Sequence, residues 1–223
     1  MAHKSHARFV LGAVAAIIAA AVVTAEIPAP AAHFDPLTAS KSTVALWMPD
    51  NQNGASGVIV APGIILTAYH VVASGDQLTA ETYDGAKFPV TTTWTDKTDD
   101  LALVSYKGDI KEPVAKLSCA PLETGEKLAA VGHPMMRAMW SITHGYVAST
   151  VTPRLDGITQ HIVSLDLTII PGNSGGPIYN DKGEVVAVSD AVLLGQVGYS
   201  ASLTGLTFGV PVSDLCASLP HVA

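Results

Sequence analysis

From residue 42 onward, short apolar or alternating runs are separated by Gly, Pro, Asn and Asp along the chain. Representative runs are TVALWM, GIILTA, LALVSY, KLAAVG, QHIVSLDLTII and EVVAVSDAV. Runs of strand length at this spacing are typical of an all-β sandwich or barrel, and long helices are not expected. Residues 108–125 have the weakest pattern, which indicates a connector between two β lobes.

The two ends of the chain differ from this pattern. Near the C-terminus, Ser213 stands in a capping position before a short apolar stretch, and Pro220 follows it, so we expect a small terminal helix. At the N-terminus, Lys4 and Arg8 precede the apolar run at residues 9–23, and small residues follow. This order predicts an export signal. The run approaches the length of a membrane-spanning helix, so an uncleaved anchor is the alternative.

The composition limits the classes of function. A chain of 223 residues, 48% of them hydrophobic, can bury the core of one ordinary domain or of two small lobes. The formal net charge is -7 and Lys and Arg are not clustered, so we expect no nucleic-acid partner. The only cysteines are Cys119 and Cys216. In an exported protein such a pair favours a disulfide, with two unrelated buried cysteines as the alternative.

One serine lies in a glycine-rich stretch, GNSGGP, at residues 172–177. The stretch fits the loose G-x-S-x-G pattern of an α/β-hydrolase elbow, which needs a helix after the serine and a histidine downstream. Here two strand-like runs joined by NDKG follow the serine, and the only downstream histidine is His221, close to the end. This context argues against an elbow.

A histidine and an acid precede the serine instead. His70 follows an apolar run, and Asp100 stands at the head of the run LALV. The order His, Asp, Ser recurs in catalytic triads built on β-barrels. A serine hydroxyl needs an imidazole to accept its proton, and the imidazole needs a carboxylate to orient it and stabilise its cation. We assign these roles to Ser174, His70 and Asp100, because the adjacent Asp99 should face the opposite way in a strand.

Attack by the serine would create a negatively charged oxygen that needs donors already in place. The main-chain N–H groups of Gly172 and Ser174 can supply them. Glycine suits this loop because it tolerates strained angles and leaves room for a substrate carbonyl beside the amides.

Three motifs in register carry a family resemblance: SGVIVAPGIILTAYHVV, DDLALV and GNSGGPIYNDKGEVVAVSDA. They resemble the trypsin-like serine peptidases of the chymotrypsin fold, most of all the bacterial heat-shock protease branch. The resemblance covers about residues 42–219. It implies an all-β fold of two six-stranded antiparallel β-barrels, with the catalytic groups in the cleft between them and a short C-terminal helix.

The domain organisation follows from the resemblance and from the N-terminal pattern. We expect a signal peptide or anchor at 1–25, a Pro/Ala-rich linker at 26–41 and a protease domain at 42–219. Within that domain we expect barrel one at about 42–108, a connector at about 109–124, barrel two at about 125–212 and the terminal helix at about 213–219. Because the chain stops after that helix, we expect no peptide-binding C-terminal module and no cage-like assembly driven by one.

The resemblance places the oxyanion loop at Gly172 to Ser174, with Asn173 between them. Many digestive relatives have an aspartate at that middle position, which pairs with a newly released N-terminus. Asn173 has no charge to pair, so no freed terminus should be required. Cys119 and Cys216 occupy positions where some trypsin-like enzymes link the connector to the terminal helix, which further favours the disulfide.

The resemblance also implies a substrate-binding region. Ser189, Asp190 and Ala191 match a strand that pairs with substrate backbone, and Thr168 lies near the floor of the primary pocket. Ala191 and Gly209 line its walls. Because no carboxylate occupies the floor, a buried Lys or Arg would have no partner, and we expect uncharged P1 side chains. Strand alternation should turn Asp190 away from the pocket.

These observations predict an exported serine endopeptidase that acts on a protein or peptide substrate without a cofactor. A catalytically silent protease-fold binding protein is the alternative. We expect a secreted or periplasmic location, with membrane contact only through an uncleaved N-terminal segment, and the oligomeric state stays open. His133, His144 and His161 lack the spacing of a metal site, so we assign them surface or structural roles and expect no metal.

Overall fold

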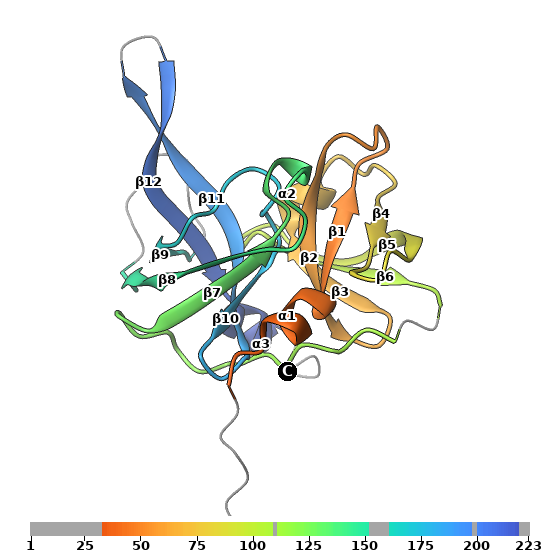
Figure 1. Ribbon diagram of the computed structural model, residues 1–223, viewed down its shortest axis with the longest axis horizontal. Coiled ribbons are helices and arrows are strands. Elements are labelled where there is room, and N and C mark those ends of the chain that lie inside the picture. The colour runs from red at the N-terminus through yellow and green to blue at the C-terminus, as the bar shows by residue number, and fades with distance from the viewer. Residues whose placement is uncertain (1–32, 109–110, 152–160, 198–199, 219–223) are drawn as a thin grey trace, which may run out of the picture. The chain divides into compact units, whose positions relative to one another are not determined.

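The computed structural model describes residues 33–108, 111–151, 161–197 and 200–218, which Figure 1 draws in colour. The predicted signal peptide or anchor at 1–25 and the first part of the linker lie outside the described residues. In the described ranges, no helix combines the length and the apolar character needed to cross a membrane.

The first barrel is closed by antiparallel strands in the order β1-β2-β3-β6-β5-β4. Its strands are β1 (Thr43–Trp47), β2 (Gly54–Ala61), β3 (Ile64–Ala68), β4 (Thr79–Glu81), β5 (Lys87–Asp96) and β6 (Leu101–Tyr106). Local sequence sets the turns: Pro62 and Gly63 join β2 to β3, and the φ of 81° at Gly63 is one that glycine adopts readily.

The second barrel is closed by antiparallel strands in the order β10-β11-β12-β9-β8-β7. Its strands are β7 (Lys127–Gly132), β8 (Ser141–Ser149), β9 (Val163–Asp166), β10 (Pro177–Asn180), β11 (Val185–Val197) and β12 (Ser200–Pro211). The β10–β11 turn is the hairpin that the NDKG sequence predicts, and the Asn180 side chain accepts the main-chain N–H groups of Lys182 and Glu184. The prediction of two six-stranded antiparallel barrels is confirmed.

Short helices lie at the edges of the barrels: α1 (Pro36–Ser42), α2 (Tyr69–Val72), the 3-10 turn η1 (Pro134–Met136) and α3 (Val212–Ser218). Helix α1 covers the end of the segment expected to be a linker. It forms there because Asp35 caps it by accepting the N–H of Thr38, and Pro36 suits the first turn. Helix α3 begins at Val212, so Ser213 lies inside it and is not its N-cap as expected.

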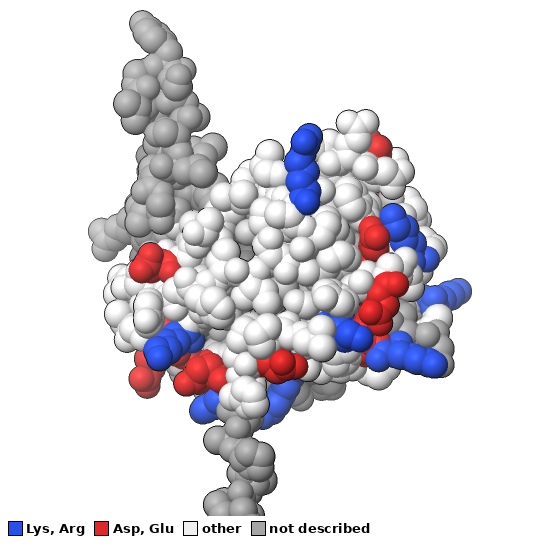
Figure 2. Space-filling model, in the orientation of Figure 1, with Lys and Arg blue, Asp and Glu red and all other residues white. Residues whose placement is uncertain are grey.

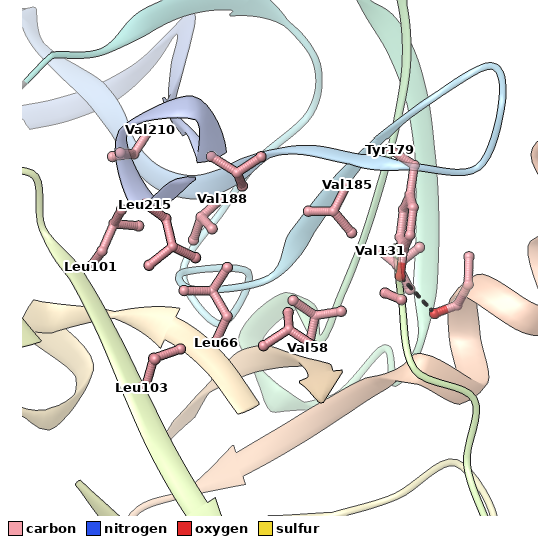
Figure 3. Packing of buried hydrophobic residues seen from close by; sticks show 14 of the residues in the cluster. Val58, Leu66, Leu101, Leu103, Val131, Tyr179, Val185, Val188, Val210 and Leu215 are labelled. Atoms are coloured by element: carbon pink, nitrogen blue, oxygen red, sulfur yellow. Dashed lines mark hydrogen bonds between the residues drawn. The ribbon is translucent and has the colours of Figure 1, made fainter. Parts of the chain in front are cut away.

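A hydrophobic cluster with residues from both barrels joins them. Figure 3 shows Val58 and Leu66 of the first barrel facing Val185 and Val188 of the second, and all four are buried. Burying apolar area of this kind contributes roughly 25 cal/mol per Å². The cluster therefore keeps the two barrels in contact. The expected site residues lie near the ends of strands of these two barrels.

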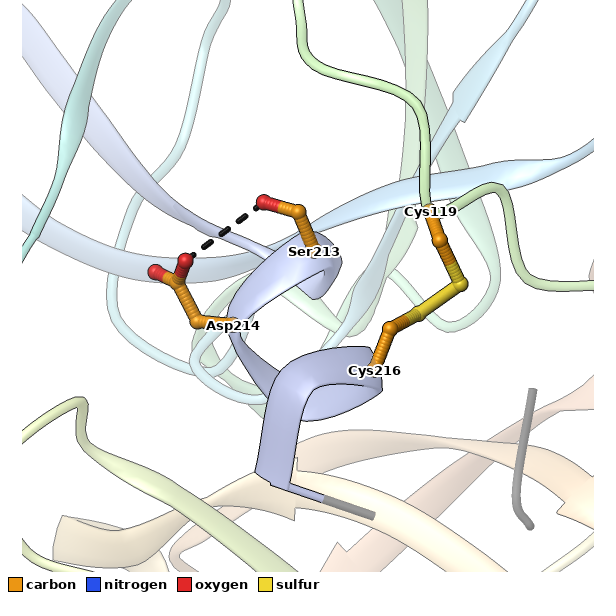
Figure 4. The surroundings of a disulfide bond; sticks show 4 residues. All are labelled: Cys119, Ser213, Asp214 and Cys216. Atoms are coloured by element: carbon orange, nitrogen blue, oxygen red, sulfur yellow. Dashed lines mark hydrogen bonds between the residues drawn. A yellow bond between two sulfur atoms is a disulfide. The ribbon is translucent and has the colours of Figure 1, made fainter. Parts of the chain in front are cut away.

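The connector is fastened to α3 by a disulfide between Cys119 and Cys216, drawn in Figure 4. The two Cα atoms are 5.9 Å apart and the cysteines are separated by 97 positions in the sequence. The predicted bond is confirmed. It ties the segment between the barrels to the end of the fold.

Charged side chains are scattered over the face drawn in Figure 2. Acidic and basic residues lie mainly along its lower and right-hand edges, and much of the centre is uncharged. On this face the acidic and basic side chains are mixed, and neither sign forms a large patch.

Candidate active site

Strand pairing brings His70 and Asp100 together. Strands β3 and β6 pair so that Ala68 lies opposite Leu101, which makes the start of α2 a neighbour of the turn before β6. Asp100, in that turn, has a φ of 52°. The His70 ring nitrogen Nδ1 lies 2.7 Å from Asp100 Oδ2, and the His70 main-chain N–H donates to Asp100 Oδ1 at 2.8 Å. The structure therefore pairs the expected base with the expected acid.

The environment of His70 favours its protonated form. Burial of the ring by itself would lower the pKa of His70. The hydrogen bond to Asp100, the charge of Asp100 and the charge of Asp190 act in the opposite direction and together raise the pKa above its ordinary value of 6.5. A base with a raised pKa accepts a proton from a serine more readily.

The loop carrying Ser174 begins with a tight turn. The Asn173 N–H donates to the Ile170 carbonyl at 3.0 Å, with Pro171 and Gly172 at the two central positions. Gly172 has a φ of 98°, as the second central residue of a type II turn requires. A Cβ there would collide with the main chain of His133, so glycine is needed for space as well as for conformation.

This turn uses the Asn173 amide and leaves the amides on either side of it without a partner in the loop. The Asn173 N–H is bonded to the Ile170 carbonyl, so of the three loop residues Asn173 is not available as a main-chain donor to an oxyanion. Within the described residues, the N–H groups of Gly172 and Ser174 have no hydrogen-bond acceptor. These two amides are the pair that the chemistry of a developing oxyanion requires.

The carbonyl groups of the same loop accept hydrogen bonds from residues outside the loop. The Pro171 carbonyl accepts the N–H of Met135 at 2.7 Å. The Gly172 carbonyl accepts the Ser56 hydroxyl, and the Ser174 carbonyl accepts the Ser56 N–H, each at 2.8 Å. Since flipping a peptide would break one of these bonds, they keep the free amides pointing away from the carbonyls.

Sequence reasoning missed the histidine that supports this arrangement. His133 is fully buried, and its Nδ1 lies 2.8 Å from the Ser56 hydroxyl oxygen. The single hydroxyl proton of Ser56 goes to Gly172, so Nδ1 of His133 must be the donor in that contact. Burial lowers the pKa of His133 to about 3, which keeps the ring neutral. No sequence signal links His133 to Ser56, because they lie on different barrels.

The Ser174 hydroxyl is close to a different group from the one expected. It donates to the main-chain carbonyl of Asp190 at 3.3 Å, and no hydrogen bond joins it to His70 among the described residues. Rotation of the Ser174 side chain has to bring the hydroxyl to His70 before the imidazole can accept its proton.

Two of the expected substrate-binding residues make close contacts within the fold. The Ser189 carbonyl accepts the N–H of Gly175, and the Ser189 N–H donates to the Gly176 carbonyl, both at 2.8 Å. Its main chain is therefore used within the fold and cannot pair with a substrate. An added Cβ at Gly209 would lie 3.0 Å from Ile178 and 3.1 Å from Leu165, so this position is closely packed.

The other expected substrate-binding residues lie near the end of the same sheet. Thr168 is exposed, and its carbonyl accepts the Thr143 hydroxyl at 3.2 Å. Ala191 belongs to β11, and its side chain lies outside the described part. A register shift between Ser189 and Val192 breaks the alternation of β11. Asp190 lies at this shift, and its carboxylate oxygen is 4.0 Å from His70 Nδ1.

In the described part of the chain, His70, Asp100 and Asp190 form the one group whose potential metal-ligating atoms come together, all within 4.8 Å of one another. The hydrogen bonds already described occupy the His70 and Asp100 atoms. The arrangement suits proton transfer at a nucleophile: a carboxylate-held imidazole from one barrel and a hydroxyl with two unbound amides from the other.

Comparison with known proteins agrees with this geometry. The profile of the trypsin-like peptidase domain family matches residues 55–188. A probable periplasmic serine endoprotease DegP-like of Pseudomonas putida (strain GB-1) is 31% identical over 160 residues, covering 71% of this chain and 32% of its own. A protein of the same description from Chlamydia pneumoniae is 30% identical over 159 residues, covering 70% and 31%. The chain thus spans about a third of these relatives.

Solved structures show the same fold. The structure described as HtrA-type protease AlgW with tripeptide superposes with a TM-score of 0.71 at 24% identity. The match covers 83% of this chain and 62% of that one. A structure of the same protease with a decapeptide gives a TM-score of 0.70 at 21% identity. At this level of identity the similarity establishes the two-barrel architecture.

Proposed function

Because this chain belongs to the family of trypsin-like peptidase domains, we propose that it is an exported serine endopeptidase acting through an acyl-enzyme on Ser174. One observation carries the proposal. The 2.7 Å contact between His70 and Asp100 lies on one barrel, and the other barrel presents a serine beside two amides without acceptors. Each of these features is needed for acyl transfer.

In the first half of the reaction, the Ser174 hydroxyl turns from Asp190 to His70 and its oxygen attacks the scissile carbonyl carbon. Nε2 of His70 accepts the hydroxyl proton, while Asp100 holds the opposite nitrogen and stabilises the imidazolium. The oxygen of the tetrahedral intermediate accepts the N–H groups of Gly172 and Ser174. The C–N bond then breaks, and His70 returns the proton to the leaving amine.

In the second half, a water molecule attacks the acyl-enzyme. His70 accepts a proton from the water, and the same two amides stabilise the second oxyanion. The ester bond to Ser174 breaks as His70 returns that proton to the serine oxygen. A carboxylic acid product leaves, and the enzyme is restored with no cofactor consumed.

The disulfide and the names of the relatives support an extracytoplasmic location, and Thr168 supports a preference for uncharged P1 residues. Disulfides persist in oxidising compartments, and the relatives from Pseudomonas and Chlamydia carry names that include the word periplasmic. At the expected pocket floor stands Thr168, which offers no charge to a basic or acidic side chain. Cleavage of a peptide library, followed by mass spectrometry of the products, measures the preference directly.

The hydrogen bond from Ser174 to the Asp190 carbonyl favours one second candidate, a silent binding protein whose hydroxyl stays away from His70. An alkyl fluorophosphonate separates the two functions, since it reacts with an activated serine. We expect stoichiometric labelling of the protein, loss of labelling in Ser174→Ala, and unchanged labelling in the exposed control Ser74→Ala. Folded protein that does not label supports the binding protein.

A further inference from the structure

A second carboxylate lies beside the proposed catalytic histidine. Asp190 Oδ1 is 4.0 Å from His70 Nδ1, on the same ring nitrogen that contacts Asp100 at 2.7 Å. The main-chain carbonyl of Asp190 also accepts the Ser174 hydroxyl. Asp190, a residue of β11, therefore accepts a hydrogen bond from Ser174 and also lies beside the ring of His70.

The fold fixes Asp190 in this place. Both main-chain groups of the preceding residue, Ser189, are bonded to the nucleophile loop at Gly175 and Gly176. Asp190 stands where the register of β11 shifts against β12, and its carboxylate lies 4.0 Å from His70 Nδ1. Its side chain is only 6% exposed, which leaves little surface for binding a substrate side chain. Asp190 is thus placed to act on His70 and not on the substrate.

The charged groups that face the His70 ring come from two elements. Asp100 approaches from the turn before β6, and Asp190 approaches from β11. The potential ligand atoms of His70, Asp100 and Asp190 all lie within 4.8 Å of one another. Both negative charges therefore act on the imidazolium that forms during attack, and both lie at distances where an opposite charge stabilises a cation strongly.

We propose that Asp190 is a positioning residue for His70, supplying a second counter-charge to its imidazolium beside that of Asp100. The proposal rests on the proposed peptidase function of the same site. It requires Asp190 to be ionised when His70 is protonated. Two carboxylates this close could instead share a proton, in which case Asp190 would be neutral and would add no counter-charge.

The test is a nitrogen-15 NMR titration of the His70 ring, which needs no turnover. The background is Ser174→Ala, so that self-cleavage cannot occur, and Asp190→Asn is added to it. Asn has the shape of Asp without its charge. We expect the pKa of His70 to fall by about one unit in the double variant, the low end of the range for a charge at this distance. An unchanged or higher pKa overturns the proposal.

Asp99→Asn is the matched control, because it removes the same charge from the residue next to Asp100. Asp99 interacts with Asp214, Asp96 and His161 and not with His70, so the pKa of His70 should stay unchanged. Thermal unfolding shows whether Asp190→Asn is folded, and Asp190→Ser replaces it if it is not. The result expected from either variant is the same fall in pKa.

A second readout links the residue to the reaction. In otherwise unaltered protein, Asp190→Asn should move the acid limb of the kcat/KM profile to lower pH by the same shift as the NMR pKa. Failure of the wild-type protein to react with a fluorophosphonate contradicts the peptidase function, whereas the NMR titration still decides whether Asp190 acts on His70. The two failures are therefore distinguishable.

Discussion

The two barrels contribute to the candidate site in different ways. On the first barrel, His70 and Asp100 are joined directly by their own side chains and by the pairing of β3 with β6. On the second barrel, the Ser174 loop is held mainly by hydrogen bonds to its carbonyl groups, and two of the donors belong to Ser56 of the first barrel. The first arrangement is local, and the second depends on contact between the barrels.

This difference separates chemistry from positioning. Changes at His70 or Asp100 should remove a reacting or charge-stabilising group, whereas changes at Ser56 or His133 should leave every reacting group present but less well placed. The following experiments are ordered by their expected effect, taking a tenfold change in rate as about 1.4 kcal/mol.

The largest effect is expected from Asp100→Asn. An amide can hold His70 in the wrong tautomer, and it cannot stabilise the imidazolium, so kcat for a peptide substrate should fall by about 10⁴-fold. Steady-state kinetics measures the loss. Asp99→Asn is the control, and it should retain most of the activity; equal losses in the two variants would show that the pairing with His70 is not what matters.

The disulfide should matter for stability and not for chemistry. Replacing Cys119 and Cys216 by Ser opens a loop spanning 97 positions, which in the chain-entropy model costs about 4 to 5 kcal/mol of unfolding free energy. Urea unfolding measures this loss. The described residues of the connector and α3 supply no group to the site, so activity per folded molecule should be unchanged. A matching loss of kcat would mean that the bridge also positions the Ser174 loop.

Ser56→Ala tests the dependence of the loop on the other barrel. The change removes the donor to the Gly172 carbonyl while leaving both amides in the chain, so kcat should fall by at most about 10²-fold with KM little changed. It also leaves the buried Nδ1–H of His133 without an acceptor, at a cost of about 1 to 3 kcal/mol in stability. Kinetics and urea unfolding of the same sample separate the two effects. An unaltered kcat would show that Ser56 does not position the Ser174 loop for catalysis.

The smallest effect, when it is taken per pH unit, concerns the pH dependence of stability. His133 has a folded pKa of about 3 against an ordinary value of 6.5, so between these values the unfolded chain binds more protons. Stability should therefore fall as pH drops from 6.5 toward 3, by up to about 1.4 kcal/mol per unit from this residue.

His133→Asn keeps a donor for Ser56 but removes the titrating ring. In urea unfolding measured from pH 6.5 downward, the unfolding free energy of this variant should depend less steeply on pH, by the equivalent of one bound proton. His144 is exposed on β8, so His144→Asn is the control and should retain the full slope. An identical slope in His133→Asn and the wild-type protein would mean that His133 is not buried in its neutral form.

Local sequence patterns were enough to predict an all-β fold and the hairpin after β10. The two six-stranded barrels were predicted from the family resemblance, and the pairing of Cys119 with Cys216 from their being the only cysteines together with that resemblance. The pairing of His70 with Asp100 was also predictable, since each flanks a strand. The support of the loop by Ser56 and His133 was not, because it depends on how strands from different barrels pack. Nor was the closeness of the Asp190 carboxylate to His70, because it depends on how β11 of the second barrel packs against the first barrel.

The most direct test of the central claim is a crystal structure of the fluorophosphonate-treated protein. The account predicts a covalent bond from Ser174 Oγ to phosphorus, with the phosphoryl oxygen about 2.7–3.1 Å from the nitrogens of Gly172 and Ser174. It also predicts His70 Nε2 beside the serine oxygen and Nδ1 still bonded to Asp100. A phosphoryl oxygen directed away from both amides, or an adduct on any other residue, would contradict it.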